Sequence, residues 1–205
     1  PVDGFMEVSN DVRAGGFLEI EHPAGQKMVP DNNMSIGFPG NGPTVIAVAS
    51  FISRKAMADG SESPEQNRSG DRASSSSRGP TRNVTATGLK PDIAAPGQYV
   101  VAPLSGDYEA SEIESFFLED LLVFEGAYGT QDSYIAFEGT SMASPIVAGT
   151  VALLLEADPS LTVERLRELL DETAVSDEFT GGVPNSDWGR GKLDAFAMMQ
   201  ALSTQ

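Results

Sequence analysis

The stretch FEGTSMASPIVAGTVALLLEADPS, from Phe137 to Ser160, joins a short hydroxyl-bearing opening to a long apolar run. Gly139 permits backbone conformations that other residues resist. Thr140 and Ser141 are residue types that favour the N-cap of a helix. The apolar run predicts a helix over residues 141–156, so Ser141 is expected where a loop becomes a buried helix.

The composition of this helix predicts how it packs. Pro145 lies close to the helix start, in the first turn, where its missing N–H needs no partner. Four small residues predict a close neighbour, and four larger apolar residues predict a buried face. The small residues are Ala143, Ser144, Ala148 and Gly149, and the larger ones are Val147, Val151, Leu154 and Leu155.

The position of Ser141 has a chemical consequence. The first turn of a helix carries N–H groups without intrahelical partners and the positive end of the helix dipole. An oxyanion formed by attack of the Ser141 hydroxyl on a carbonyl carbon would meet these donors. The same spacing also fits a plain capped core helix, and the pattern alone leaves both interpretations open.

The composition of the chain excludes several classes of partner. The 205 residues include 30 acidic and 13 basic side chains, for a formal net charge of −17. Such a surface repels nucleic acid and anionic membranes and suits a salty exterior. No apolar run reaches the ~18 uninterrupted residues of a membrane span. The absence of Cys excludes disulfides and thiolate metal sites.

The N-terminal sequence PVDGFMEV lacks the basic start and apolar run of a signal peptide. Because the chain does not begin with Met, we expect a processed product or a piece of a longer protein. The length suits one globular domain or part of a larger one.

Apolar patterns predict the other elements. Strands are expected at residues 16–21, at 43–51 (a buried strand of a parallel sheet) and at 99–102, and a surface loop at 57–90. Thr162 is expected to cap a second helix with Glu164 in its first turn. Its buried stripe is predicted to contain Val163, Leu166, Leu169 and Leu170. A loop over 180–191 and a short final helix over 192–202 complete the chain.

Residues 105–135 have the character of an insertion. Apolar residues at helical spacing predict a surface helix here. They are Ile113, Phe116, Phe117, Leu121 and Phe124. A calcium site formed by Glu112, Glu114, Glu119 and Asp120 is the weaker interpretation, because no Asp-x-Asp-x-Asp-Gly loop is present.

The string GTSMASPIVAG, residues 139–149, resembles the nucleophile motif of the subtilisin-like serine proteases, or subtilases. Three further segments resemble the same family in the same order: IGFPGNGPTVIAVASF, SSSSRGPTRNVTATGLKPDIAAPG and NSDWGRGKLDAFAMMQAL. The resemblance implies that residues 35–205 form the C-terminal part of a subtilase catalytic domain, with an insertion at 105–135. Residues 1–34 are expected to end an inserted β-module.

The resemblance implies a partial α/β fold, doubly wound around a mostly parallel sheet with helices on both faces. It also implies roles for individual residues. Ser141 would be the nucleophile, supported by Gly139, Thr140 and Met142, with its own N–H as an oxyanion donor. Phe137 and Met142 would line the pocket on the leaving-group side. Gly37 would form the floor of the main specificity pocket, although a simple turn glycine explains it equally well.

Other parts of the family pattern are missing. Subtilases carry an Asp in an Asp-Ser/Thr-Gly context, a His in His-Gly-Thr and an oxyanion Asn in a Gly-Asn segment, and none of these strings occurs here. The one histidine, His22 in EHPAG, has the wrong surroundings for the base and is interpreted as a surface-loop residue. Asp92 resembles a structural residue rather than the triad acid. The catalytic Asp and His are therefore expected upstream, and this chain alone is expected to be nearly inactive.

The resulting hypothesis is a secreted or cell-surface serine endopeptidase that acts on proteins or peptides through an acyl-enzyme. It requires no cofactor and no catalytic metal, and Ca2+ is at most a structural ion. Its partner within the protein would be the missing N-terminal half of the catalytic domain, without which apolar surface is exposed. The alternative is a non-catalytic pseudoprotease that serves as a binding or scaffold module. An esterase is disfavoured because no Gly-x-Ser-x-Gly elbow is present.

Overall fold

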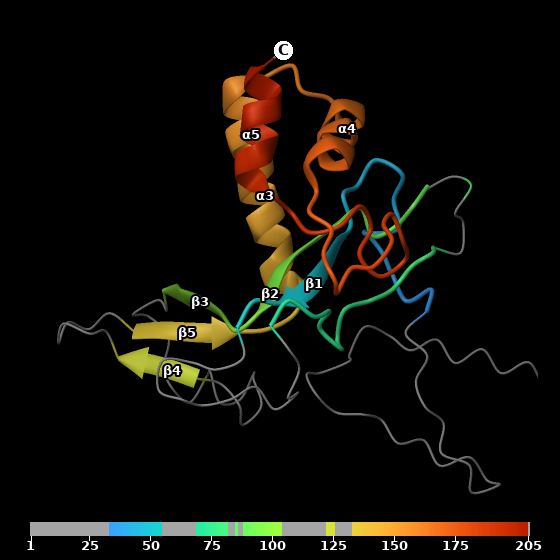
Figure 1. Ribbon diagram of the computed structural model, residues 1–205. Helices are drawn as coiled ribbons and strands as arrows, with labels where there is room; N and C mark the ends of the chain where they lie inside the picture. The colour runs from blue at the N-terminus through green and yellow to red at the C-terminus, as the bar shows by residue number, and fades with distance from the viewer. Residues whose placement is uncertain are drawn as a thin grey trace, which may run out of the picture.

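The computed structural model describes residues 33–54, 69–81, 85, 88–103, 122–125 and 133–204 (Figure 1). The expectations for the strand at 16–21, for His22 and for the acidic residues at 112–120 lie outside these residues.

Two strands form the parallel part of the fold. Strand β1 (Val48–Ile52) pairs in parallel with β2 (Ile93–Gln98), in register from Val48 opposite Ile93. The predicted strand at 43–51 is thus confirmed for its second half. The sequence pattern missed β2, because Pro96 and Gly97 are residue types that strands disfavour.

A second, antiparallel sheet follows β2 without a crossover. Its strands are β3 (Val100–Pro103), β4 (Leu122–Glu125) and β5 (Ser133–Phe137), in the order β3-β5-β4. Tyr99, at φ 53°, lies between β2 and β3, where the chain leaves one sheet and enters the other. The strand predicted at 99–102 is confirmed to within one residue.

Strand β4 corrects the prediction that the helix in the insertion extends through Phe124. Phe124 lies opposite Tyr134 in the β4–β5 ladder. The apolar spacing fitted a helix, but Leu, Val and Phe in sequence also fit a strand, and the pairing with β5 decides between them.

Three helices complete the described structure: α3 (Thr140–Ala157), α4 (Val163–Thr173) and α5 (Ala195–Ser203). The cap predicted for α4 is confirmed, because Thr162 Oγ1 accepts the Arg165 N–H at 3.1 Å. Helix α5 begins three residues later than predicted. Asp194 caps it by accepting the Ala197 N–H at 2.9 Å, a cap that the sequence analysis overlooked.

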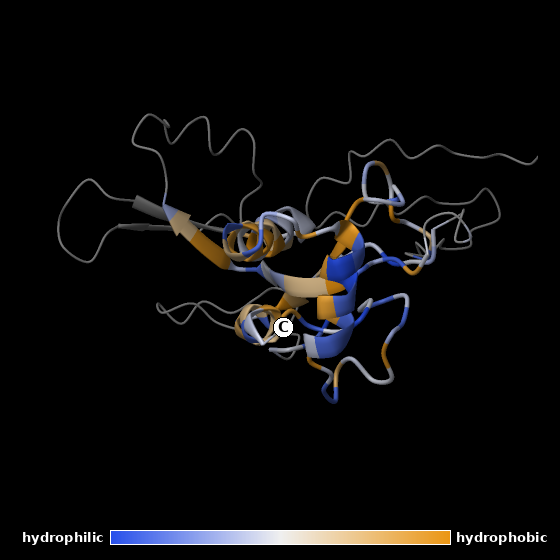
Figure 2. Ribbon diagram, turned by 90° about the horizontal axis from the view of Figure 1, so that it is seen from above, coloured by the Kyte–Doolittle hydropathy of each residue, from blue (hydrophilic) through white to orange (hydrophobic). Residues whose placement is uncertain are grey.

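The core lies between the parallel strands and the helices. Ile93 and Ala95 of β2 pack with Ala143, Val147 and Leu154 of α3. The same cluster includes Leu166, Leu169 and Leu170 of α4 and Met198 of α5. Figure 1 shows all three helices on one side of the strands, and Figure 2 shows apolar residues along both α3 and α5.

The buried face of α3 is narrower than predicted. Val151 is half-buried and Leu155 is 40% exposed. Of the four small residues, Ala143 is buried, whereas Ser144, Ala148 and Gly149 are exposed. The described residues therefore cover one face of α3 and leave an apolar face open.

Candidate active site

Ser141 is the second residue of α3, and its side chain is exposed. The N-cap is Gly139, with φ 126° and ψ 166°, a combination that only glycine adopts readily. No side chain caps the helix. The prediction that Thr140 or Ser141 would occupy the N-cap was therefore wrong by one or two residues.

The missing cap leaves N–H groups of α3 available. The residue four positions before Ser141 is Phe137, which belongs to β5, so the Ser141 N–H has no acceptor within the helix. The Met142 N–H donates to the Gly139 carbonyl at 3.0 Å. The first turn of α3 contains no acidic residue. An oxygen anion beside Ser141 would thus meet an N–H that has no acceptor within the helix, and the positive end of the helix dipole.

Pro145 lies deeper in the helix than expected. It is the sixth residue of α3, in the second turn, rather than a residue of the first turn. In a regular helix the N–H of residue 145 would donate to the Ser141 carbonyl, and proline cannot make this bond. The Ser141 carbonyl therefore lacks the helical N–H donor that it would otherwise have.

Two glycines bring the nucleophile loop against strand β2. The Gly139 N–H donates to the Gly97 carbonyl at 2.6 Å. A Cβ at Gly97 would lie 2.2 Å from Ser50 Oγ and 2.7 Å from the Gly139 carbonyl oxygen. Only glycine fits there. The sequence analysis quoted Gly97 within PDIAAPG but did not assign it this role.

A side-chain contact holds the same junction. Gln98, the last residue of β2, is 2% exposed, and its Nε2 donates to Glu138 Oε2 at 3.1 Å. The Gln98 carbonyl accepts the Ser53 hydroxyl at 3.2 Å. Glu138 itself is exposed. The carboxyl end of β2 thus positions an acidic side chain three residues before Ser141, which sequence reasoning also missed.

The other predicted site residues lie in two places. Phe137 ends β5 opposite Val100, while Thr140 and Met142 belong to the first turn of α3, and all three side chains are half-buried. Gly37 lies in a separate exposed turn, where its carbonyl accepts the Asn41 N–H at 3.1 Å. Its role in a specificity pocket stays a prediction.

The part of the chain that the structure describes contains no histidine, because His22 lies outside it. The base that would activate Ser141 is thus not among the residues placed around it. Within the same described ranges, no group of three or more His, Asp and Glu residues could hold a metal ion.

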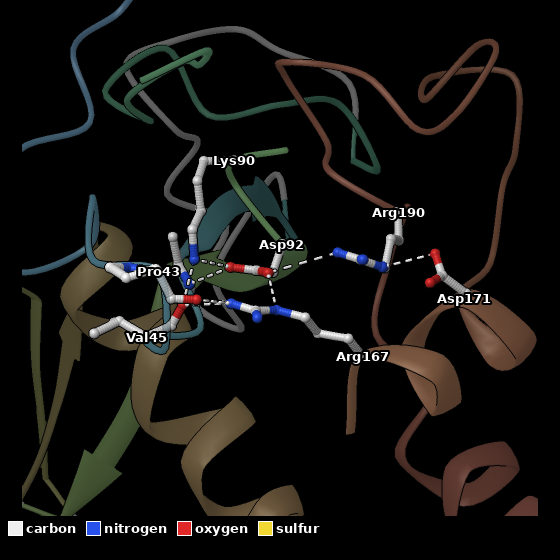
Figure 3. A network of polar contacts seen from close by, with 8 residues as sticks. Pro43, Val45, Lys90, Asp92, Arg167, Asp171 and Arg190 are labelled. Carbon is white, nitrogen blue, oxygen red and sulfur yellow. Dashed lines mark hydrogen bonds and ion pairs between the residues drawn. The ribbon is translucent and has the colours of Figure 1, made fainter. Parts of the chain in front are cut away.

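Asp92 lies at the opposite end of β2, in the network of Figure 3. Its Oδ2 accepts the Ala47 N–H at 2.8 Å and pairs with Lys90 Nζ at 2.6 Å. Its Oδ1 faces Arg167 Nε at 3.1 Å and Arg190 Nη1 at 3.5 Å.

Asp92 is 1% exposed, and Arg190 also pairs with Asp171 at 2.7 Å. The network therefore links the amino ends of β1 and β2 to α4 and to the C-terminal loop. Asp92 and Gln98 stand six strand residues apart, about 20 Å at 3.3 Å per residue. The position of Asp92 supports its interpretation as a structural residue.

Helix α3 (Thr140–Ala157) is, by length and composition alone, the one helix of the described residues that could cross a membrane. A core helix of a soluble protein passes the same test. In the described structure α3 packs on β1, β2 and α5, and 22% of its residues are buried.

A sequence model of the Subtilase family, Peptidase_S8, matches residues 23–193. Serine protease AprX of Bacillus subtilis is 33% identical over 159 residues, which cover 76% of this chain and 32% of AprX. The halolysin-like extracellular serine protease Nep of Natrialba magadii is 42% identical over 64 residues, covering 31% of this chain and 11% of Nep.

The fold also matches a solved structure. The CspB protease of Clostridium perfringens superposes with a TM-score of 0.59 at 24% identity, over 88% of this chain and 32% of that protein. The likeness confirms the predicted α/β fold. The chain spans about a third or less of the length of these three proteins.

Proposed function

The chain belongs to the subtilase family of serine peptidases, and we propose that it carries the nucleophile of a serine endopeptidase, Ser141. The observation that carries this proposal is the exposed Ser141 side chain at the second position of α3, where no side chain caps the helix. A plain core helix would have no need of an exposed serine at this position.

The proposed reaction is acyl transfer. Ser141 Oγ attacks the carbonyl carbon of a peptide bond while a histidine base accepts its proton. The carbonyl oxygen becomes an oxyanion, which the Ser141 N–H stabilises together with an asparagine side chain. Collapse of this intermediate expels the amine, protonated by the same histidine. Water then hydrolyses the acyl-enzyme and regenerates Ser141.

The histidine, its aspartate partner and the asparagine belong, in this proposal, to the preceding part of the same protein. The greater length of the relatives supports this arrangement. The same part would cover the exposed apolar face of α3, which includes Leu153 at 52% exposure. Gly37 and Phe137 remain the proposed substrate-binding residues of this chain.

Secretion is proposed from two observations. The name of the relative Nep describes an extracellular protease, and the net charge of −17 suits a salty exterior. The substrates would be proteins or peptides, and the chemistry of the family needs no cofactor. A structural Ca2+ ion would bind outside the described residues of this chain.

A pseudoprotease that binds without cleaving is the second candidate. Its support is the absence of the Asp, His and Asn motifs from the chain. The exposed serine at the start of α3 supports the catalytic candidate instead, because a binding module has no chemical need for it.

The test is labelling of the full-length protein with a fluorophosphonate probe, which reacts with an activated serine. We expect labelling of the wild type and none of Ser141→Ala, with turnover of peptide substrates lowered by about 10⁶, as for subtilisin itself. Ser144→Ala is the matched control, because Ser144 is an exposed serine on the same helix. A folded full-length protein without labelling would overturn the endopeptidase and favour the pseudoprotease.

A further inference from the structure

Glu138 is the acidic residue nearest in sequence to the nucleophile in the described part of the chain. Ser141 is the third residue after Glu138, so their Cα atoms lie at most about 11 Å apart. The side chain of Glu138 is exposed, and the residue precedes the turn at Gly139 that opens α3. A peptide held against Ser141 thus passes within reach of a carboxylate.

The carboxylate is held in place. Gln98 Nε2 donates to Glu138 Oε2 at 3.1 Å, and Gln98 is itself buried at the end of β2. The Gly139 N–H bonds the Gly97 carbonyl at 2.6 Å, which fixes the backbone on the other side of Glu138. An anchored charge loses less conformational entropy on pairing than a freely rotating one.

The anchor lies at the end of the sheet where ligands usually bind. In open α/β sheets, ligands bind outside the carboxyl ends of the parallel strands. Gln98 is the carboxyl-terminal residue of β2, and Glu138 is bonded to it. The Glu138 carboxylate is therefore bonded to the end of the sheet at which open α/β folds bind their ligands.

We propose that Glu138 is a specificity-determining residue that selects peptides with Lys or Arg beside the scissile bond. The inference rests on the proposed endopeptidase function. Glu138 would pair with the basic side chain of the bound peptide, and an acidic side chain at the same position would be repelled. Glu138 takes no part in the covalent steps.

The experiment measures kcat/KM of the full-length protein on matched peptides that carry Lys, Gln or Glu at each position flanking the cleaved bond. We expect a Lys-to-Gln ratio of roughly two- to fivefold at one of these positions, as for an exposed ion pair. Glu138→Gln should bring the ratio to about one, and Glu138→Lys should invert it. The wild-type ratio should fall as salt increases, because salt screens exposed charges.

Glu156→Gln is the control, because Glu156 is an exposed acid at the far end of α3, about 22 Å from Ser141 along the helix. It should leave the ratio unchanged. A wild-type ratio near one, or a ratio that Glu138→Gln does not alter, would overturn this inference and leave the endopeptidase standing. Cleavage of no peptide at all would overturn the proposed function and this inference with it.

Discussion

At the scale of single residues, glycines at the site are required for two different reasons. Gly97 is required by space, because a Cβ there would collide with Ser50 Oγ and the Gly139 carbonyl. Gly139 is required by backbone conformation, because the nearest atom to a Cβ there is Ser141 N at 3.8 Å. The nucleophile loop therefore depends on one steric and one conformational constraint.

Gly139→Ala is expected to lower the free energy of unfolding by about 1–3 kcal/mol, the cost of a non-glycine residue in a disfavoured backbone region. Gly182→Ala is the matched control, because a Cβ at Gly182 also has open space but its φ is not positive. That control should stabilise by about 0.4–1 kcal/mol by restricting the unfolded chain. Urea denaturation of both variants checks the difference, and equal effects would contradict a conformational cause.

At the scale of elements, a buried lysine ties the C-terminal loop to β1. Lys192 Nζ pairs with Asp177 Oδ2 and bonds the Gly70 carbonyl, both at 2.6 Å. The ammonium group lies 5.0 Å from the ring centroids of Phe51 and Phe179 and 5.1 Å from that of Trp188. Three aromatic faces and two oxygen atoms thus surround the Lys192 ammonium group. These contacts hold together segments that are distant in sequence.

The acid partner makes this contact sensitive to pH. Burial acts to raise the pKa of Asp177, but the hydrogen bonds from Lys192 and from the N–H groups of Thr180 and Phe179 outweigh it, so the pKa is lowered. Asp177 therefore stabilises the fold above its unfolded pKa of about 3.9, and this contribution is lost as the pH falls through its folded pKa.

Asp177→Asn is expected to melt below the wild type at pH 7, with a difference that narrows as the pH falls below about 3.9. Thermal melting of both proteins from pH 7 to acid measures this difference. Glu178→Gln removes the neighbouring exposed carboxylate and should show no such convergence. A constant gap between Asp177→Asn and wild type at every pH would refute the ion-pair explanation.

At the scale of the whole molecule, the described residues leave large apolar side chains in water. Phe38 is 86% exposed, Phe196 72% and Leu153 52%. Leu153 and Leu155 are both exposed on α3. Large exposed apolar side chains of this kind indicate a surface that another part of the protein covers.

The 205-residue chain by itself is therefore expected to aggregate. Leu153→Glu should raise its soluble fraction, and Thr44→Glu, which adds the same charge at an exposed polar position, should raise it less. Size-exclusion chromatography of the three chains compares them. A monodisperse wild-type monomer with a cooperative thermal transition would contradict the expectation.

Local elements whose signals lie within a few residues could be predicted from the amino-acid sequence. The Thr162 cap and the buried leucines of α4 follow from capping chemistry and side-chain spacing, which act over one or two turns. The motif around Ser141 also identified the family before any fold was known, because its residues are contiguous.

Features that depend on partners distant in sequence could be found only once the fold was known. Strand β2 exists despite Pro96 because β1 pairs with it, and β4 replaces the predicted helix at Phe124 because β5 lies beside it. Three sets of contacts join segments that are 40 or more residues apart in sequence. They are the Gly97–Gly139 hydrogen bond, the Gln98–Glu138 hydrogen bond, and the ion pairs of Asp92 with Arg167 and Arg190. No local pattern encodes such contacts, because folding alone brings their residues together.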